Sequence, residues 1–61
     1  MYVILGEVNG STMAIGGWSD YTDAEKDFYR LEEQDFYDRL IIKKGGSTIL
    51  DSVKIKLDKT I

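Results

Sequence analysis

A single helical pattern in residues 22–34 most constrains what this chain can fold into. Ala24, Phe28 and Leu31 follow the i, i+4, i+7 spacing that places apolar side chains on one face of a helix. The opposite face is expected to expose Lys26, Tyr29, Arg30 and Glu33 to water. A helix with one apolar stripe needs a packing surface, and the segments on either side must supply it.

The flanking residues predict where this helix begins and ends. Thr22 and Glu25 have the spacing of a capping box, so we expect the helix to begin at about Asp23. Continuation beyond Gln34 would turn the carboxylate of Asp35 onto the apolar stripe, where an unpaired charge is costly. The helix is therefore expected to end near Gln34.

The residues before the helix predict a β-hairpin. Residues 2–8 and 12–18 are rich in strand-forming types, and Asn9-Gly10 between them suits a two-residue type I′ turn. This turn sets Val8 opposite Ser11, Gly6 opposite Met13 and Ile4 opposite Ile15. One face would then carry Tyr2, Ile4, Val8, Met13 and Ile15, and the other Val3, Leu5, Ala14 and Trp18. Both faces are apolar, so the pattern leaves open which of them meets the helix.

Gly16 and Gly17 leave two positions without side chains at the end of the second strand. Glycine in a strand typically marks a bulge or makes room for a neighbouring aromatic ring, and we favour that interpretation. The alternative is a phosphate-binding loop ahead of the helix, but no glycine-rich fingerprint follows and the nearby acids would repel a phosphate.

The residues after the helix predict a second hairpin. Residues 37–44 and 48–57 are separated by the turn residues 45–47. Asp51 would fall on the apolar side of the last strand, so we expect a bulge in residues 50–52 that returns it to solvent. The chain is therefore predicted to be one domain, residues 1–61, of the α+β class. Its order is ββαββ, with one helix on a mostly antiparallel sheet of about four strands.

Charge is distributed unevenly along the chain. Residues 20–38 hold eight of the eleven acidic residues and only two of the eight basic ones, Lys26 and Arg30. The rest of the chain is net basic. Acids crowd the carboxyl end of the predicted helix, where the helix dipole disfavours each anion by about 0.3–1 kcal/mol. Stability alone would not select that arrangement, which leaves two interpretations: a solvated face, or an anionic surface for a basic partner.

The available residue types exclude most chemistry. Without cysteine or histidine the chain has no disulfide, no thiolate or imidazole metal ligand and no ordinary general base. The acids lack the ordered spacing of a calcium loop, so we expect no metal, no cofactor and no catalytic residue. Basic strand residues inside an acidic whole disfavour nucleic-acid binding. The apolar run in residues 1–5 is too short for a membrane span or signal core, so we expect a cytoplasmic protein.

Residues 53–61, VKIKLDKTI, resemble the carboxyl-terminal strand of the small phage-encoded uracil-DNA glycosylase inhibitors, acidic proteins that mimic DNA. The resemblance implies a class of small proteins that disable host enzymes without catalytic parts of their own. It covers nine residues, and the fourth strand and the glycine pair depart from that family. No functional residue is carried over from it.

These observations favour a non-enzymatic protein-binding module, a phage-encoded inhibitor of a host protein that acts through its acidic helix. A basic surface on the host protein would meet Tyr29, Glu32, Glu33, Asp35 and Asp38. The alternative is a homo-oligomeric structural or accessory domain that uses an exposed sheet face bearing Tyr2, Trp18, Met13 or Leu5. Oligomers are expected because a domain of this size buries only about 60% of its surface. A small enzyme is least favoured, since so short a chain has little material for a cleft.

Overall fold

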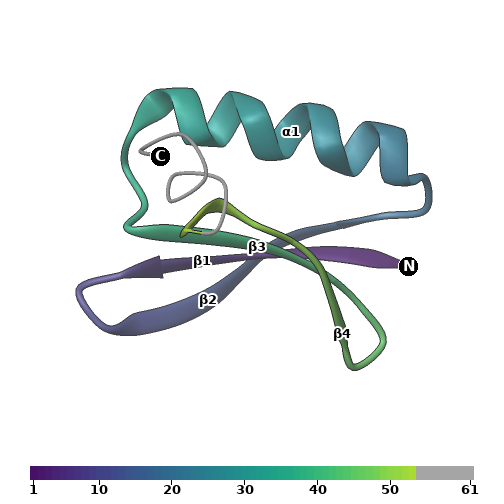
Figure 1. The fold of residues 1–61 in the computed structure, drawn as a ribbon, viewed down its shortest axis with the longest axis horizontal. Coiled ribbons are helices and arrows are strands. Elements are labelled where there is room, and N and C mark those ends of the chain that lie inside the picture. The colour runs from purple at the N-terminus through teal and green to yellow at the C-terminus, as the bar shows by residue number, and fades with distance from the viewer. Residues whose placement is uncertain (54–61) are drawn as a thin grey trace.

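The computed structural model describes residues 1–53 and shows one helix packed on a four-stranded antiparallel sheet (Figure 1). The predicted ββαββ order and the α+β class are confirmed. The elements are β1 (Tyr2–Val8), β2 (Ser11–Trp18), α1 (Tyr21–Gln34), β3 (Arg39–Lys44) and β4 (Ser47–Asp51).

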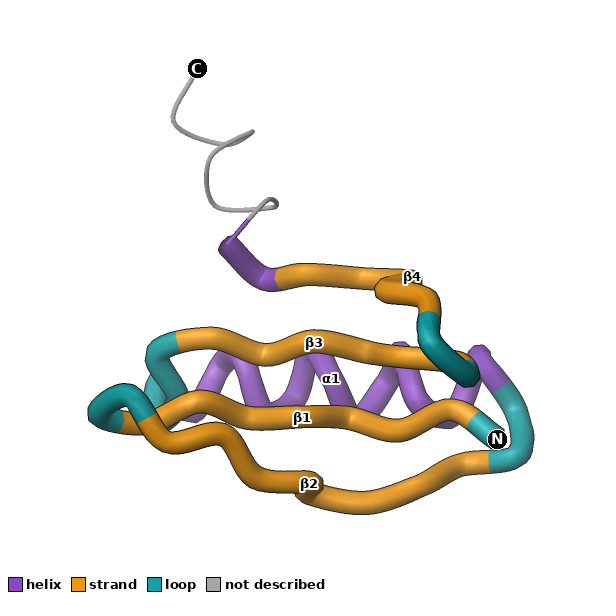
Figure 2. Tube along the Cα trace, turned by 90° about the horizontal axis from the view of Figure 1, so that it is seen from below, coloured by secondary structure: helices purple, strands orange, loops and turns teal. Residues whose placement is uncertain are grey.

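The sheet has the order β2-β1-β3-β4, and every neighbouring pair is antiparallel. Since β2 and β3 both run antiparallel to β1, they are parallel to each other, and α1 connects them across one face (Figures 1 and 2). The face opposite α1, called the open face below, carries Val3, Leu5, Ala14 and Ile41, which are aligned across three strands. The first hairpin therefore meets the helix through the face of Ile4.

The core lies between α1 and the two central strands. Its fully buried members are Ile4, Ala24, Phe28, Leu40 and Ile42. Burial of a side chain as large as Phe28 contributes about 1.5–3 kcal/mol, so a few residues of this kind dominate the stability of a small domain. The predicted helix stripe is confirmed at Ala24 and Phe28, and Leu31 is half-buried against the same cluster.

The helix begins two residues earlier than predicted. Its N-cap is Asp20, which has extended backbone and makes no side-chain capping bond, so the predicted capping box is wrong. The backbone N–H of Ala24 donates to the carbonyl of Asp20 at 3.1 Å, which closes the first turn. Tyr21 in that turn packs its ring edge-on against Tyr2 of β1, with centroids 5.5 Å apart. Tertiary packing of an aromatic residue thus extends the helix beyond the local capping signal.

The first hairpin has the predicted turn and half of the predicted register. Asn9 and Gly10 have φ values of 53° and 82°, as a type I′ turn requires. The register holds from the turn as far as Leu5, and then a bulge at Ile15 shifts it so that Ile4 pairs with Gly16. The prediction that Ile4 faces Ile15 is therefore wrong, because an extra residue in β2 is not visible to an alternation argument.

The bulge moves Trp18 to the helix side of the sheet. Trp18 pairs with Tyr2 and packs against the core, whereas the alternation predicted it on the opposite face. Its ring lies over Gly16, where an added Cβ would be 2.9 Å from Cη2, so the predicted room for an aromatic ring is confirmed. The Trp18 indole N–H donates to the carboxylate of Asp27 at 2.7 Å. Met13 is also on the helix side, because it pairs with Gly6, whose side-chain direction points at Tyr37 and Ile15. Tyr2, Trp18 and Met13 are thus not on the open face, whereas Leu5 is.

The second hairpin is shorter than predicted at both ends. β3 begins at Arg39 because Tyr37, its predicted first residue, leaves the strand and covers Gly6, where a Cβ would be 2.6 Å from the Tyr37 ring. β4 ends at Asp51, after which Ser52 and Val53 have helical backbone. The Asp51 carboxylate accepts the Val53 N–H at 3.1 Å, an N-cap contact that ends the strand. The remainder of the predicted strand lies outside the described residues.

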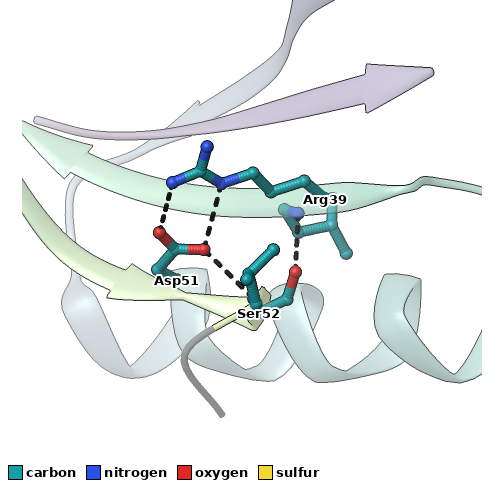
Figure 3. A network of polar contacts seen from close by, with 5 residues as sticks. Arg39, Asp51 and Ser52 are labelled. Carbon is teal, nitrogen blue, oxygen red and sulfur yellow. Dashed lines mark hydrogen bonds and ion pairs between the residues drawn. The ribbon is translucent and has the colours of Figure 1, made fainter. Parts of the chain in front are cut away.

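The predicted bulge in the last strand is present, but one residue earlier. Ile42 pairs with Leu50 and Lys43 with Thr48, which leaves Ile49 as the extra residue. Asp51 then lies on the open face beside Ile41. It is not simply solvated as predicted, because the guanidinium of Arg39 binds it through two hydrogen bonds of 2.6 and 3.2 Å (Figure 3).

Candidate functional site

The predicted partner-binding residues lie at the carboxyl end of α1 and in the connection to β3. Tyr29 and Glu33 are exposed on the helix, Glu32 is half-buried beside them, and Asp35 is exposed directly after the last helical residue. We call Tyr29, Glu32, Glu33 and Asp35 the acidic end. Tyr29 is three and four residues from the two glutamates, a spacing that makes them neighbours on a helix surface.

Tyr29 is the aromatic centre of the acidic end. Its side chain is 45% exposed, yet its ring meets buried Phe28 edge-on, with the centroids 5.4 Å apart and the planes at 90°. This contact restricts the ring while nearly half of the residue stays exposed. An aromatic ring that is already ordered loses little conformational entropy when it binds a protein, which suits a contact residue.

The backbone conformation at the acidic end, like its charge, lowers the stability of the fold. The helix ends near Gln34 as predicted, and Asp35 adopts the left-handed conformation with φ 54° while its N–H donates to the carbonyl of Glu32 at 3.2 Å. Glycine is preferred at this position because any side chain strains it. The last turn also has no basic residue, so the negative end of the helix dipole adds to the acidic side chains.

Asp38 lies apart from the acidic end and has a structural contact. Its carboxylate accepts the backbone N–H of Asn9 at 3.0 Å, and its own N–H donates to the carbonyl of Glu7 at 2.8 Å. These two bonds attach the α1–β3 connection to the turn of the first hairpin. Asp38 remains exposed and adds negative charge, but its carboxylate already has a backbone donor.

Phe36 is a surface residue that the sequence reasoning missed. It is 65% exposed, next to Asp35, and its ring meets that of Tyr37 edge-on with the centroids 5.0 Å apart. Tyr37 in turn is held over Gly6. The available signal was an aromatic pair, Phe36 and Tyr37, between two acids directly after the predicted end of the helix. A large exposed apolar side chain next to the acidic end gives that surface a second anchor of the type that dominates interface energies.

Two side-chain ion pairs lie entirely within residues 1–53. They join Arg30 to Asp27 on α1 at 3.3 Å, and Arg39 to Asp51 across β3 and β4 at 2.6 Å. Neither pair joins a helix acid to a strand lysine. The ammonium group of Lys44 lies 5.0 Å from the ring centroid of Tyr2.

The pair of Arg39 and Asp51 belongs to a structural network (Figure 3). The Asp51 carboxylate raises the pKa of Arg39 through hydrogen bonds and charge, so this cation persists at every ordinary pH. Next to the pair, buried Ser52 accepts the backbone N–H of Leu40 at 2.9 Å. These contacts hold β4 against β3.

Within the described part of the chain, no three acidic residues are grouped so that they could hold a metal ion, and no pocket is present. No helix among residues 1–53 is long and apolar enough to cross a membrane. Comparisons with protein-family models, curated proteins and solved structures find no match to the chain. The resemblance of residues 53–61 falls outside the described residues except for Val53, which has helical rather than strand backbone.

Proposed function

We propose that the chain is a non-enzymatic protein-binding module whose acidic end binds a basic surface on another protein. A phage-encoded inhibitor of a host enzyme is the class of protein that this proposal names. The nucleic-acid site of such an enzyme is a basic surface that an acidic helix could occupy as a DNA mimic. The full sequence has no histidine or cysteine, which supports binding rather than turnover.

The observation that carries the proposal is the composition of the acidic end. Exposed Glu33 and Asp35 stand where the helix dipole is already negative, and exposed Tyr29 and Phe36 lie beside them. Repulsion between each anion and the helix dipole costs roughly 0.3–1 kcal/mol of stability. The left-handed backbone of Asp35 adds strain at the same place. Charges arranged in this way accelerate encounter with a basic partner, and the aromatic side chains then supply the apolar contact.

The test compares two double variants with the same change in net charge. Glu33→Gln with Asp35→Asn removes two charges from the acidic end, and Asp20→Asn with Asp23→Asn removes two from the other end of the helix. The wild type and both variants are immobilised and exposed to bacterial lysate, and bound proteins are identified and eluted with salt. We expect a basic protein to be retained by the wild type and the Asp20/Asp23 variant, and lost by the Glu33/Asp35 variant.

The salt dependence of the isolated complex is the second readout. Raising ionic strength from 0.01 to 0.15 M shortens the screening length from about 30 to about 8 Å, so the association rate should fall steeply while dissociation changes little. Equal retention by both variants, or an association rate indifferent to salt, would refute the proposal. Tyr29→Ala should weaken the complex mainly through faster dissociation, because it removes contact rather than charge.

A further inference from the structure

The outer edge of β2 is a second surface with a definite hydrogen-bonding pattern. Among the described residues β2 pairs only with β1 and forms one edge of the sheet (Figure 2). In a two-residue hairpin the residues flanking the turn bond to each other, so Ser11 and Met13 direct their backbone groups toward β1. Thr12 and Ala14 therefore direct their N–H and C=O groups outward, where an added strand could bond to them.

The first half of this edge, residues 11–14, lacks the features that keep sheet edges apart. Residues 8–19 contain no charged residue, in a chain whose residues are 31% charged, and they contain no proline. Natural edge strands are usually blunted by lysine, proline or a bulge. The bulge of β2 is at Ile15, which leaves the four residues from Ser11 to Ala14 regular, and all four are exposed. Met13 is 49% exposed although it is large and apolar.

We propose that β2 pairs antiparallel with β2 of a second copy of this chain, with Met13 opposite the partner's Met13. In this register Thr12 exchanges backbone hydrogen bonds with the partner's Ala14, and Ala14 with the partner's Thr12. The two methionines occupy a non-hydrogen-bonded position, where Cα atoms approach to about 4.5 Å and side chains make their closest contact. The register thus covers an exposed apolar side chain with its own equivalent.

Charge favours a second copy as the occupant. In symmetric pairing the residue on the twofold axis faces its own copy, and like charges directly opposite each other are destabilising, so a strand without charged residues pairs with itself without repulsion. On the flank of α1 above β2, Asp27 binds Trp18 of β2 and forms the ion pair with Arg30, so the charge of this acid is compensated. Two copies can therefore approach along this edge although each has a net charge of −3.

The twofold axis of such a dimer runs through the sheet between the two β2 strands. Both helices then lie on the same face of one continuous sheet, and both acidic ends stay uncovered. The dimer does not depend on the proposed function, because β2 shares no residue with the acidic end.

The test uses opposite charges at one position. In analytical ultracentrifugation the wild type should have about twice the 7.0 kDa mass of the chain. Met13→Lys and Met13→Glu should each be monomeric, with the dimer dissociation constant raised at least about tenfold, because each variant sets like charges opposite each other. An equimolar mixture of the two should form the dimer again. A wild type that is monomeric at millimolar concentration, or variants that associate as the wild type does, would overturn the proposal.

A matched pair of variants separates the edge from the open face. Thr12→Pro removes an outward N–H while leaving the bonds to β1, a position where edge strands tolerate proline, and it should abolish the dimer. Ile41→Thr removes apolar surface from the open face and should leave association unchanged. The reverse result, with Ile41→Thr monomeric and Thr12→Pro dimeric, would show that copies meet through the open face and would refute the edge contact. Fluorescence of Trp18 verifies that each variant is folded.

Discussion

The hydroxyl of Ser52 makes a sharp prediction about how β4 is held to the sheet. Ser52 is 1% exposed, and its oxygen accepts the N–H of fully buried Leu40 at 2.9 Å (Figure 3). Ser52→Ala removes the acceptor and leaves the Leu40 N–H buried without a partner. That loss costs about 1–3 kcal/mol of unfolding free energy. Alanine regains up to about 0.5 kcal/mol because residue 52 has helical backbone.

The net expected loss is therefore about 0.5–3 kcal/mol. A domain of 61 residues has a total stability of roughly 3–9 kcal/mol, so this one atom accounts for a large share. Each kcal/mol lowers the melting temperature of a domain this small by about 4–8 °C. Urea unfolding followed by Trp18 fluorescence measures the change, and the m-value should stay constant because the exposed surface does not change.

Ser47→Ala is the matched control for this experiment. Ser47 is exposed in β4, the strand that precedes Ser52, so its replacement should change the unfolding free energy by no more than about 0.5 kcal/mol. If Ser52→Ala were as stable as the wild type, or if the two variants lost the same amount, the oxygen of Ser52 would not be the required partner of Leu40. The account of how β4 is attached would then be wrong.

Three further predictions follow from packing, backbone and titration. Gly6→Ala should cost about 0.5–2 kcal/mol, because its Cβ would be 2.6 Å from the Tyr37 ring and 2.8 Å from Ile15, while strand propensity returns part of the overpacking penalty. A double variant with Tyr37→Leu should recover part of this loss in urea unfolding, because it removes the closer of the two contacts. Gly10→Ala meets no atom within 4 Å but has φ +82°, so strain alone should cost about 1–2 kcal/mol in the same assay. Burial raises the pKa of the Tyr21 hydroxyl above its ordinary 10.0, and the hydrogen bond to Glu25 and the negative charge of Glu25 raise this pKa further. As pH rises, the hydroxyl therefore loses its proton in the unfolded state before it does so in the folded state. The stability from Tyr21 is thus complete below pH 10 and is lost as pH rises through the folded-state pKa; Tyr21→Phe should show a smaller loss between pH 9 and 11 in melting experiments.

The sequence by itself determined the class of fold and the position of most elements. The spacing of Ala24 and Phe28 identified the buried helix stripe, and Asn9-Gly10 identified a type I′ turn, because both signals are local and depend on backbone geometry. The acidic end was also visible in the sequence, since charge along a helix maps directly onto its surface. The interpretation of that surface as a binding site stays a proposal.

Only the tertiary structure decided which side of the sheet each residue occupies. The bulge at Ile15 transfers Trp18 to the core side, and no alternation pattern in an apolar strand marks where an extra residue will be placed. Long-range contacts likewise set the element ends: Tyr21 extends the helix by packing on Tyr2, and Asp51 ends β4 by capping Val53. These outcomes depend on residues far apart in the chain, whose packing energies exceed the propensities of about 1 kcal/mol or less that a local sequence can express.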